Sequence, residues 1–129
     1  MARGNLRLEL RAVDSTPSAM RHALSSFLTA LKIPEDRRID IVTASGEALA
    51  NAVEHAYPQS DVGGVELNAT MERPDSIMVE VIDRGAYVEP TERSNRGFGM
   101  RIVRAVAQSV EIDTAEGTAI RMTFHVARS

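Results

Sequence analysis

Two polar residues four positions apart, Glu47 and Asn51, are the clearest candidates for chemistry in this chain. Residues at this spacing lie on the same face of a helix, so the pattern places a carboxylate beside a carboxamide. A carboxamide oxygen can bind a hydrated Mg²⁺ without adding negative charge, and a carboxylate one turn away can accept a proton from a hydroxyl or a water. A polar pair on a helix is more often only a solvated face, so its interpretation depends on what else the chain contains.

An Asp-x-Gly sequence, Asp83 to Gly85, follows an apolar run that is typical of a strand. A carboxylate at the end of a buried strand is costly unless it accepts hydrogen bonds. The amino group of adenine is a donor of the right kind, and Gly85 would let the backbone approach the base. Taken alone, the sequence is more typical of an ordinary turn.

A Gly-Phe-Gly sequence is predicted to open a helix at Gly97 and Gly99. The free amides of a helix N-terminus can receive phosphate oxygens. Arg93 and Arg96, in the loop expected before this helix, are placed to meet a terminal phosphate. Each short sequence is weak by itself, but their order and spacing together indicate a nucleotide triphosphate site with a divalent cation.

Several other kinds of site are not predicted. The chain has no Gly-x-x-x-x-Gly-Lys-Ser/Thr loop, no zinc-ligand spacing and no Cys. Its net charge of −3 argues against a general nucleic-acid binder. It has no apolar run long enough to cross a bilayer and no signal-peptide core at its amino terminus. We expect a cytoplasmic protein that contacts neither nucleic acid nor membrane directly.

The elements that must position these residues follow from the hydrophobic periodicity. Alternation predicts strands over 5–13, 65–72, 76–82, 110–114 and 118–126, and apolar repeats of three and four predict helices over 17–31, 34–55 and 97–108. The strand over 76–82 is apolar nearly throughout and should be central. We expect one domain over 1–129, an α/β two-layer sandwich with a mixed, mostly antiparallel sheet and three helices on one face. The other sheet face should meet water or a partner.

The helix over 34–55 is expected to bury a stripe of residues against the core, and Gly46 within it should let the helix lie close to the sheet. Its predicted stripe contains Ile39, Val42, Gly46, Leu49 and Val53.

Four short sequences resemble, in order, the N, G1, G2 and G3 boxes of the Bergerat-type, or histidine kinase-like, ATPases. They are Glu47-x-x-x-Asn51-Ala52-x-x-His55-Ala56, Asp83-x-Gly85, Gly97-x-Gly99-Met100-x-Ile102 and Gly117-Thr118. The resemblance covers nearly the whole chain. Within the superfamily it is strongest to bacterial anti-sigma factors with serine-protein kinase activity, whose N box commonly reads Glu-Ala-x-x-Asn-Ala-x-x-His-Ala-Tyr.

This resemblance implies ATP and Mg²⁺ as cofactors. Asn51 would coordinate Mg²⁺, and Glu47 would act as the general base toward a serine hydroxyl on a protein antagonist. Arg96 or Arg93 would steady the transferring phosphoryl group. His55, at the end of the same box, is counted among the cofactor-binding residues, although as an isolated residue it is more typical of a helix end.

The resemblance also implies the lining of the nucleotide pocket. Asp83 would bind adenine, with Gly85 beside it and Thr118 supporting the pocket. Gly97 and Gly99 would border the phosphates.

The implied partners are a sigma factor and its anti-anti-sigma antagonist. The protein would hold the sigma factor until the unphosphorylated antagonist competes for it, and phosphorylation would release the antagonist. A homodimer is also expected, because such proteins are often dimers. Tyr87 departs from the family, since it stands at the second Gly of the usual Asp-x-Gly-x-Gly. Two alternatives therefore stay open: a sequestration module without kinase activity, and a kinase domain cut from a larger regulator.

Overall fold

The computed structural model describes residues 4–55, 63–84 and 96–126. Within these ranges it contains every helix and strand that the periodicity predicts, with boundaries that differ by a few residues at most. The elements are β1 (Asn5–Arg11), α1 (Thr16–Ala30), α2 (Glu35–His55), β2 (Gly64–Arg73), β3 (Ser76–Asp83), α3 (Arg96–Val106), β4 (Ser109–Asp113) and β5 (Thr118–His125). None of the helices in these ranges is both long and apolar enough to cross a membrane.

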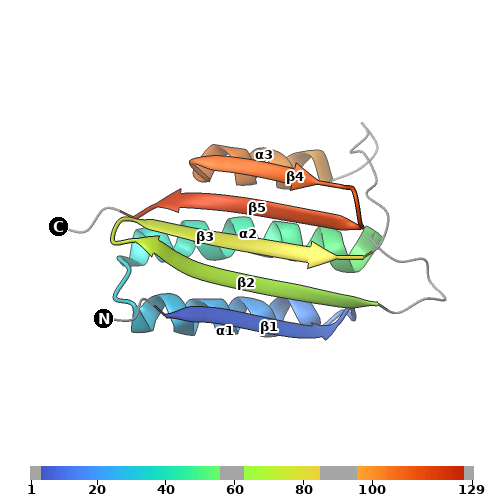
Figure 1. Ribbon diagram of the computed structural model, residues 1–129, viewed down its shortest axis with the longest axis horizontal. Coiled ribbons are helices and arrows are strands. Elements are labelled where there is room, and N and C mark those ends of the chain that lie inside the picture. The colour runs from blue at the N-terminus through green and yellow to red at the C-terminus, as the bar shows by residue number, and fades with distance from the viewer. Residues whose placement is uncertain (1–3, 56–62, 85–95, 127–129) are drawn as a thin grey trace.

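The strands form one sheet in the order β1-β2-β3-β5-β4, and the three helices cover one of its faces (Figure 1). The two-layer fold class and the central place of β3 are confirmed. The expected mixed sheet is wrong in one detail, because all four pairings among the described strands are antiparallel. The reason lies in the last hairpin: β5 turns back after β4 and inserts between β4 and β3, so that these two strands never pair.

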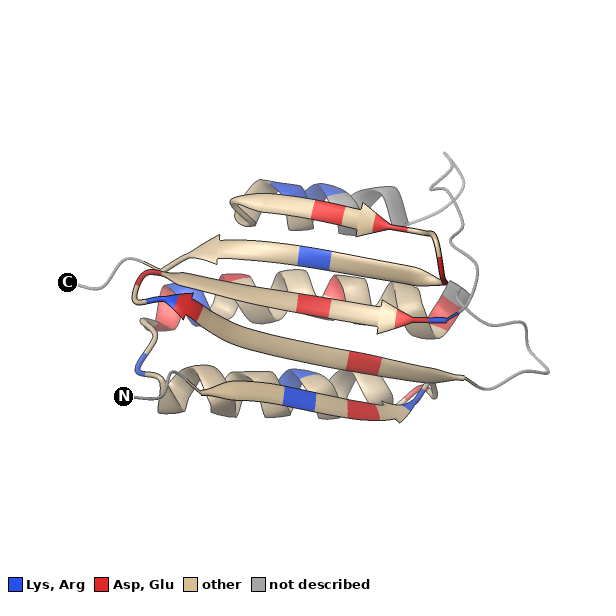
Figure 2. Cartoon of the chain, viewed as in Figure 1, with Lys and Arg blue, Asp and Glu red and all other residues tan. Residues whose placement is uncertain are grey.

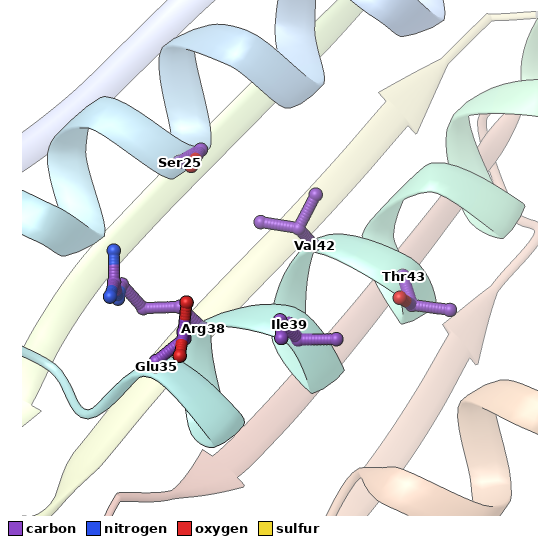
Figure 3. Close-up of a pocket in the computed structure, with 6 residues that line it drawn as sticks. All are labelled: Ser25, Glu35, Arg38, Ile39, Val42 and Thr43. Atoms are coloured by element: carbon purple, nitrogen blue, oxygen red, sulfur yellow. The ribbon is translucent and has the colours of Figure 1, made fainter.

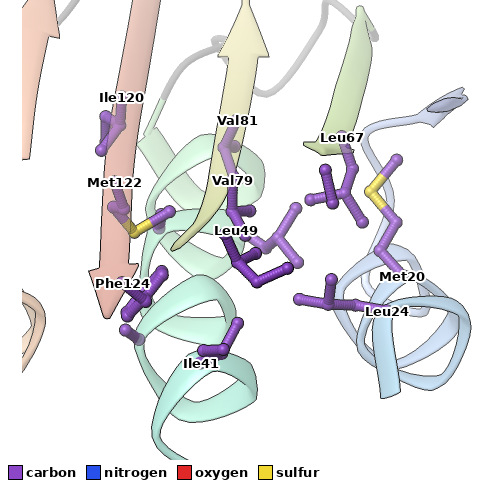
Figure 4. Close-up of a cluster of buried hydrophobic side chains, with 14 of the residues drawn as sticks. Met20, Leu24, Ile41, Leu49, Leu67, Val79, Val81, Ile120, Met122 and Phe124 are labelled. Carbon is purple, nitrogen blue, oxygen red and sulfur yellow. The ribbon is translucent and has the colours of Figure 1, made fainter. Parts of the chain in front are cut away.

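The core lies between this sheet and the helices (Figure 4). Side chains along β2 and β3 alternate between buried and partly buried positions, and the buried set faces the helices. From the helical layer, Met20 and Leu24 on α1 and Ile41 and Leu49 on α2 are fully buried. Burying one such side chain contributes roughly 1.5–3 kcal/mol. This apolar contact holds α2 in a fixed position against β3.

The core stripe predicted for α2 is partly wrong. Leu49 and Gly46 are buried, but Ile39 is 58% exposed and Val42 and Val53 are only partly buried. The prediction followed the large apolar residues and overlooked small ones. The buried side of α2 consists mainly of Ile41, Ala44, Ser45, Ala48, Leu49 and Ala52.

The role expected of Gly46 also needs correction. A Cβ atom built at Gly46 would lie 2.8 Å from Cδ of Arg21, which belongs to α1. The glycine therefore makes room for an arginine stem from the neighbouring helix rather than for the sheet. An α-helix packs against more than one neighbour, and sequence periodicity alone does not say which one a small residue faces.

The strand residues that point away from the helices are mostly polar, as the alternation predicts, and charged positions recur along the strands (Figure 2). Arg7, Asn68, Glu80, Arg121 and Glu111 lie in one row across all five strands, each directly opposite the next. Arg121 joins two of them, with its guanidinium 2.8 Å from the Glu80 carboxylate and 3.4 Å from that of Glu111. The hydrogen bond and charge of Glu80 raise the pKa of Arg121 above its ordinary value. This row supports the register of the sheet and leaves the opposite face for the helices.

Candidate nucleotide-binding site

Helix α2 positions the first two candidate residues, Glu47 and Asn51. They lie one helical turn apart, about 6 Å along the axis. Both side chains are half-buried, whereas Glu54 on the same helix is exposed. Their neighbours Ala48 and Ala52 are buried in the core. The pair therefore lies at the border of the core, which distinguishes it from an ordinary solvated helix face.

Several segments that are distant in the sequence meet at one end of the molecule (Figure 1). This end gathers the C-terminal turns of α2, the end of β3, the start of β5 and the start of α3. The end of β3 lies beside the start of β5 because the two strands pair antiparallel, from Ser76↔His125 to Asp83↔Thr118. Helices α2 and α3 also pack against each other. The described residues of the N, G1, G2 and G3 sequences thus lie at the same end of the fold.

Asp83 and Thr118 are the buried polar residues of this end. They lie directly opposite each other on β3 and β5, and each is only 5% exposed. Opposite residues in a sheet have Cβ atoms about 5 Å apart and point to the same face. Both residues fall in the buried phase of their strands, so they share the face covered by the helices. A buried carboxylate and a hydroxyl in this position provide hydrogen-bonding groups that suit the edge of an adenine base.

Gly117 allows the backbone before β5 to lie close to the end of β3. It has a φ of +85°, and a Cβ atom at this position would lie 2.3 Å from the carbonyl oxygen of Asp83 and 2.5 Å from Cα of Arg84. No residue with a side chain fits there without a shift of the backbone. Gly117 lies in the turn between β4 and β5, and this turn packs against the end of β3 at Asp83.

For the remaining predicted residues, the structure gives at most the position in a helix. His55 is the last residue of α2, while Gly97 and Gly99 lie in the first turn of α3. Arg96 was expected in the loop before this helix, but it is the first helical residue. Helix ends are the least certain feature of a periodicity argument, because the first turn needs no apolar residue. The other predicted positions, Gly85, Tyr87 and Arg93, lie outside the described residues.

The residues that the structure describes contain no group of three or more His, Cys, Asp or Glu side chains that could hold a metal ion. A carboxamide oxygen such as that of Asn51 is a ligand type that Mg²⁺ accepts, and it adds no negative charge beside a phosphate. The remaining positions would be filled by nucleotide phosphates and water, which is an arrangement that Mg²⁺ favours. The donor set at this end fits a magnesium nucleotide.

Comparison with known sequences decides the family. The family model of the histidine kinase-like ATPase domain matches residues 11–124. The chain belongs to this family. The match runs from the end of β1 into β5, so this histidine kinase-like ATPase domain includes the four sequences described above.

Curated relatives of this ATPase domain are similar over nearly their whole length. The anti-sigma F factor of Bacillus subtilis (strain 168) is 26% identical over 98% of this chain and 96% of its own. The anti-sigma F factor of Caldanaerobacter subterraneus subsp. tengcongensis is 25% identical over 96% of this chain and 95% of its own.

Solved structures agree with this fold. The RsbU and RsbW domains of Rv1364c from Mycobacterium tuberculosis match with a TM-score of 0.80 and 25% identity, covering 98% of this chain. The match spans 33% of that longer chain. The histidine kinase domain of a blue-light activated histidine kinase from Erythrobacter litoralis matches with a TM-score of 0.62 over 83% of this chain and 61% of its own. At 16% identity, this second likeness concerns the fold alone.

Proposed function

We propose that this ATPase domain is an anti-sigma factor that uses ATP and Mg²⁺ to phosphorylate a serine of its protein antagonist. The observation that carries the proposal is the buried pair of Asp83 and Thr118 at the end of the sheet that α2 and α3 also reach. The similarity to anti-sigma F factors over 98% of the chain supports the biological setting. The proposed partners are accordingly a sigma factor and an anti-anti-sigma protein, with a cytoplasmic location and a homodimer as the assembly.

The proposed mechanism assigns separate tasks to two sides of the site. Asp83 accepts a hydrogen bond from the adenine amino group, and Thr118 supports the carboxylate from the next strand. Gly85 would lie beside the base. This side binds and orients the nucleotide, and its burial strengthens the hydrogen bonds because water does not compete for them.

The second side of the site would bind Mg²⁺ and the phosphates and would accept the proton of the serine hydroxyl. Asn51 would hold Mg²⁺, and Glu47 would accept the proton from the serine hydroxyl as that oxygen attacks the terminal phosphate. Bound ATP would supply the phosphoryl group and leave as ADP, and its cation would neutralise the charge that develops. The amides at Gly97 and Gly99 would border the phosphates, with His55 nearby and Arg96 or Arg93 steadying the transferred group.

Calorimetry of ATP binding, followed by a phosphorylation assay, tests this proposal. The purified chain should bind ATP in the presence of Mg²⁺, and Asn51→Ala should abolish the Mg²⁺-dependent part of the binding. A serine-bearing anti-anti-sigma protein should then gain one phosphate from ATP. Absence of binding at millimolar nucleotide would contradict the assignment of the site.

A second candidate function is supported by Tyr87, which stands where the family usually has its second G1 glycine. A side chain at this position would crowd the nucleotide, and the chain would then act by sequestration alone. Antagonist release distinguishes the two functions. It should stop in Glu47→Ala if phosphorylation is the switch, and it should continue unchanged if sequestration alone operates.

A further inference from the structure

A shallow hollow of about 300 Å³ lies between the C-terminal half of α1 and the first turns of α2. Figure 3 views it with the strands behind the two helices. The hollow combines one cation, one carboxylate, two hydroxyls and two branched apolar side chains. Its lining residues are Ser25, Glu35, Arg38, Ile39, Val42 and Thr43.

Arg38 is the unusual member of this lining. Its Nη1 donates a hydrogen bond of 2.9 Å to Oγ1 of Thr29 on α1. Its Nε is buried and has no hydrogen-bond partner within the described chain. Arg38 also forms no ion pair with any described residue, whereas the adjacent Arg37 lies 2.5 Å from the carboxylate of Asp40. Arg38 is therefore a partly buried cation that forms no ion pair within the described part of the molecule.

A guanidinium with a buried, unsatisfied N–H and no ion pair favours binding of a hydrogen-bond acceptor from a ligand. A buried N–H that has lost water without gaining another partner is costly, and most such groups in proteins are satisfied. A carboxylate is a strong acceptor for guanidinium because both hydrogen bonding and charge contribute. Figure 3 shows the guanidinium of Arg38 extended from α2 towards α1, along one wall of the hollow.

The apolar wall beside Arg38 favours a ligand that carries an apolar group as well as an acid. Ile39 is 58% exposed, the highest fraction among the large hydrophobic residues that the structure describes, and Val42 is partly buried next to it. An inorganic anion would gain nothing from this wall, and the Glu35 carboxylate in the lining repels a doubly charged phosphate more strongly than a singly charged carboxylate. Glu35 and Asp36 also already place negative charge at the N-terminus of α2.

We propose that this hollow is a docking site for a segment of a partner protein that carries an Asp or Glu beside a branched apolar side chain. The acidic side chain binds Arg38, and the apolar side chain covers Ile39 and Val42. Arg38 and Asn51 are separated by about 20 Å along the axis of α2. A partner can therefore occupy the hollow without covering the proposed nucleotide site.

Selection from a phage-displayed library of random dodecapeptides tests this site without knowledge of the natural partner. The library is selected on the purified full chain in the presence of ATP, and the affinities of recovered peptides are measured by fluorescence polarisation. We expect a group of peptides whose binding falls at least about tenfold in both Arg38→Gln and Ile39→Ser. Each should contain an Asp or Glu near a Leu, Ile or Val, and replacing that acid by its amide should weaken binding similarly.

Arg37→Gln is the matched control, because Arg37 is the neighbouring arginine and already has an internal ion pair. It should change peptide affinity by less than about twofold. All three variants should keep the unfolding midpoint of the parent chain, since Ile39 is largely exposed and neither arginine belongs to the apolar core. Their ATP affinity should also be unchanged, so a failure of ATP binding would count against the proposed function and not against the docking site.

Two outcomes would overturn the proposal. In the first, no recovered peptide depends on Arg38, or the dependent peptides keep their affinity without the acid. In the second, inorganic phosphate alone shifts the Nε–H resonance of Arg38 in a ¹⁵N spectrum and displaces the peptides. That result would identify a small-anion site in place of a protein-docking site.

Discussion

A Cβ atom on Gly117 would lie only 2.3 Å from the carbonyl oxygen of Asp83. This close approach brings the last hairpin against the end of β3. It also places Thr118, the next residue, opposite Asp83 with both side chains buried. The proposed adenine contact therefore depends on a backbone contact that only glycine permits.

Gly117→Ala tests this dependence. The added methyl group would meet backbone atoms, and the φ of +85° disfavours any other residue. We expect the free energy of unfolding in urea to fall by about 2 kcal/mol or more. Gly64→Ala is the control, because its nearest neighbour would be a side-chain oxygen of Glu9 at 3.3 Å, which can move. Equal losses in the two variants would contradict the importance of this approach.

Asp83→Asn tests the proposed role of the carboxylate. An amide of the same shape replaces one acceptor oxygen with a donor, which would face the donor amino group of adenine. We expect ATP affinity, measured by calorimetry, to fall at least about tenfold, or roughly 1.4 kcal/mol. Asp75→Asn changes an exposed carboxylate at the opposite end of β3 and should leave ATP affinity as it was. An Asp83→Asn protein that folds and binds ATP normally would disprove the assignment.

Glu47→Gln separates proton transfer from binding. The substitution keeps the size of the side chain but removes the base. We expect phosphorylation of the antagonist serine to slow by about 10²- to 10⁴-fold, with ATP affinity retained. The matched control is Glu54→Gln on the exposed side of the same helix, which should phosphorylate at the parental rate. Similar rates for all three proteins would show that Glu47 is not the base.

Gly46→Ala tests the packing of Arg21 over α2. Alanine favours a helix over glycine by about 1 kcal/mol, but its methyl group would lie 2.8 Å from Cδ of Arg21. We expect these effects to offset each other, so that the free energy of unfolding changes little. In an Arg21→Ala background the obstacle is gone, and Gly46→Ala should stabilise by about 1 kcal/mol. A double-mutant cycle in urea measures this coupling, and additive effects would rule it out.

Arg121 lies in the row of charged residues on the uncovered face of the sheet. It should contribute little to the pH dependence of stability near neutral pH. Its pKa is raised in the fold by Glu80. Stability linked to a raised pKa is fully present below the pKa of the unfolded chain and is lost only as pH passes the pKa of the folded protein, which for this guanidinium lies far above neutral pH. Arg121→Gln should therefore lower stability equally at pH 6 and pH 9. The loss should be at most about 1 kcal/mol and smaller at high salt, because Arg121 is 51% exposed.

Most of the fold could be predicted from local pattern. The alternation in β2 and β3 and the repeats of three and four in the helices reflect burial on one side, which every element needs. Errors arose where burial depends on small residues: Ala44, Ser45 and Ala48 make up much of the buried side of α2, yet sequence reasoning placed Ile39 there. A small residue carries little hydrophobic signal, so its orientation depends on the neighbour that packs against it.

Local sequence patterns were enough to identify the polar residues of the candidate site and their order along the chain. Glu47 and Asn51 share a helix face because the helix repeat requires it, and Asp83 ends an apolar strand. Which residues lie side by side, in contrast, became clear from the packing of the elements. The insertion of β5 beside β3 places Thr118 opposite Asp83, and the packing of α1 on α2 gives Arg38 a hydroxyl of Thr29 as its partner and no ion pair among the described residues. Both results depend on contacts between segments far apart in the chain, which no local period encodes.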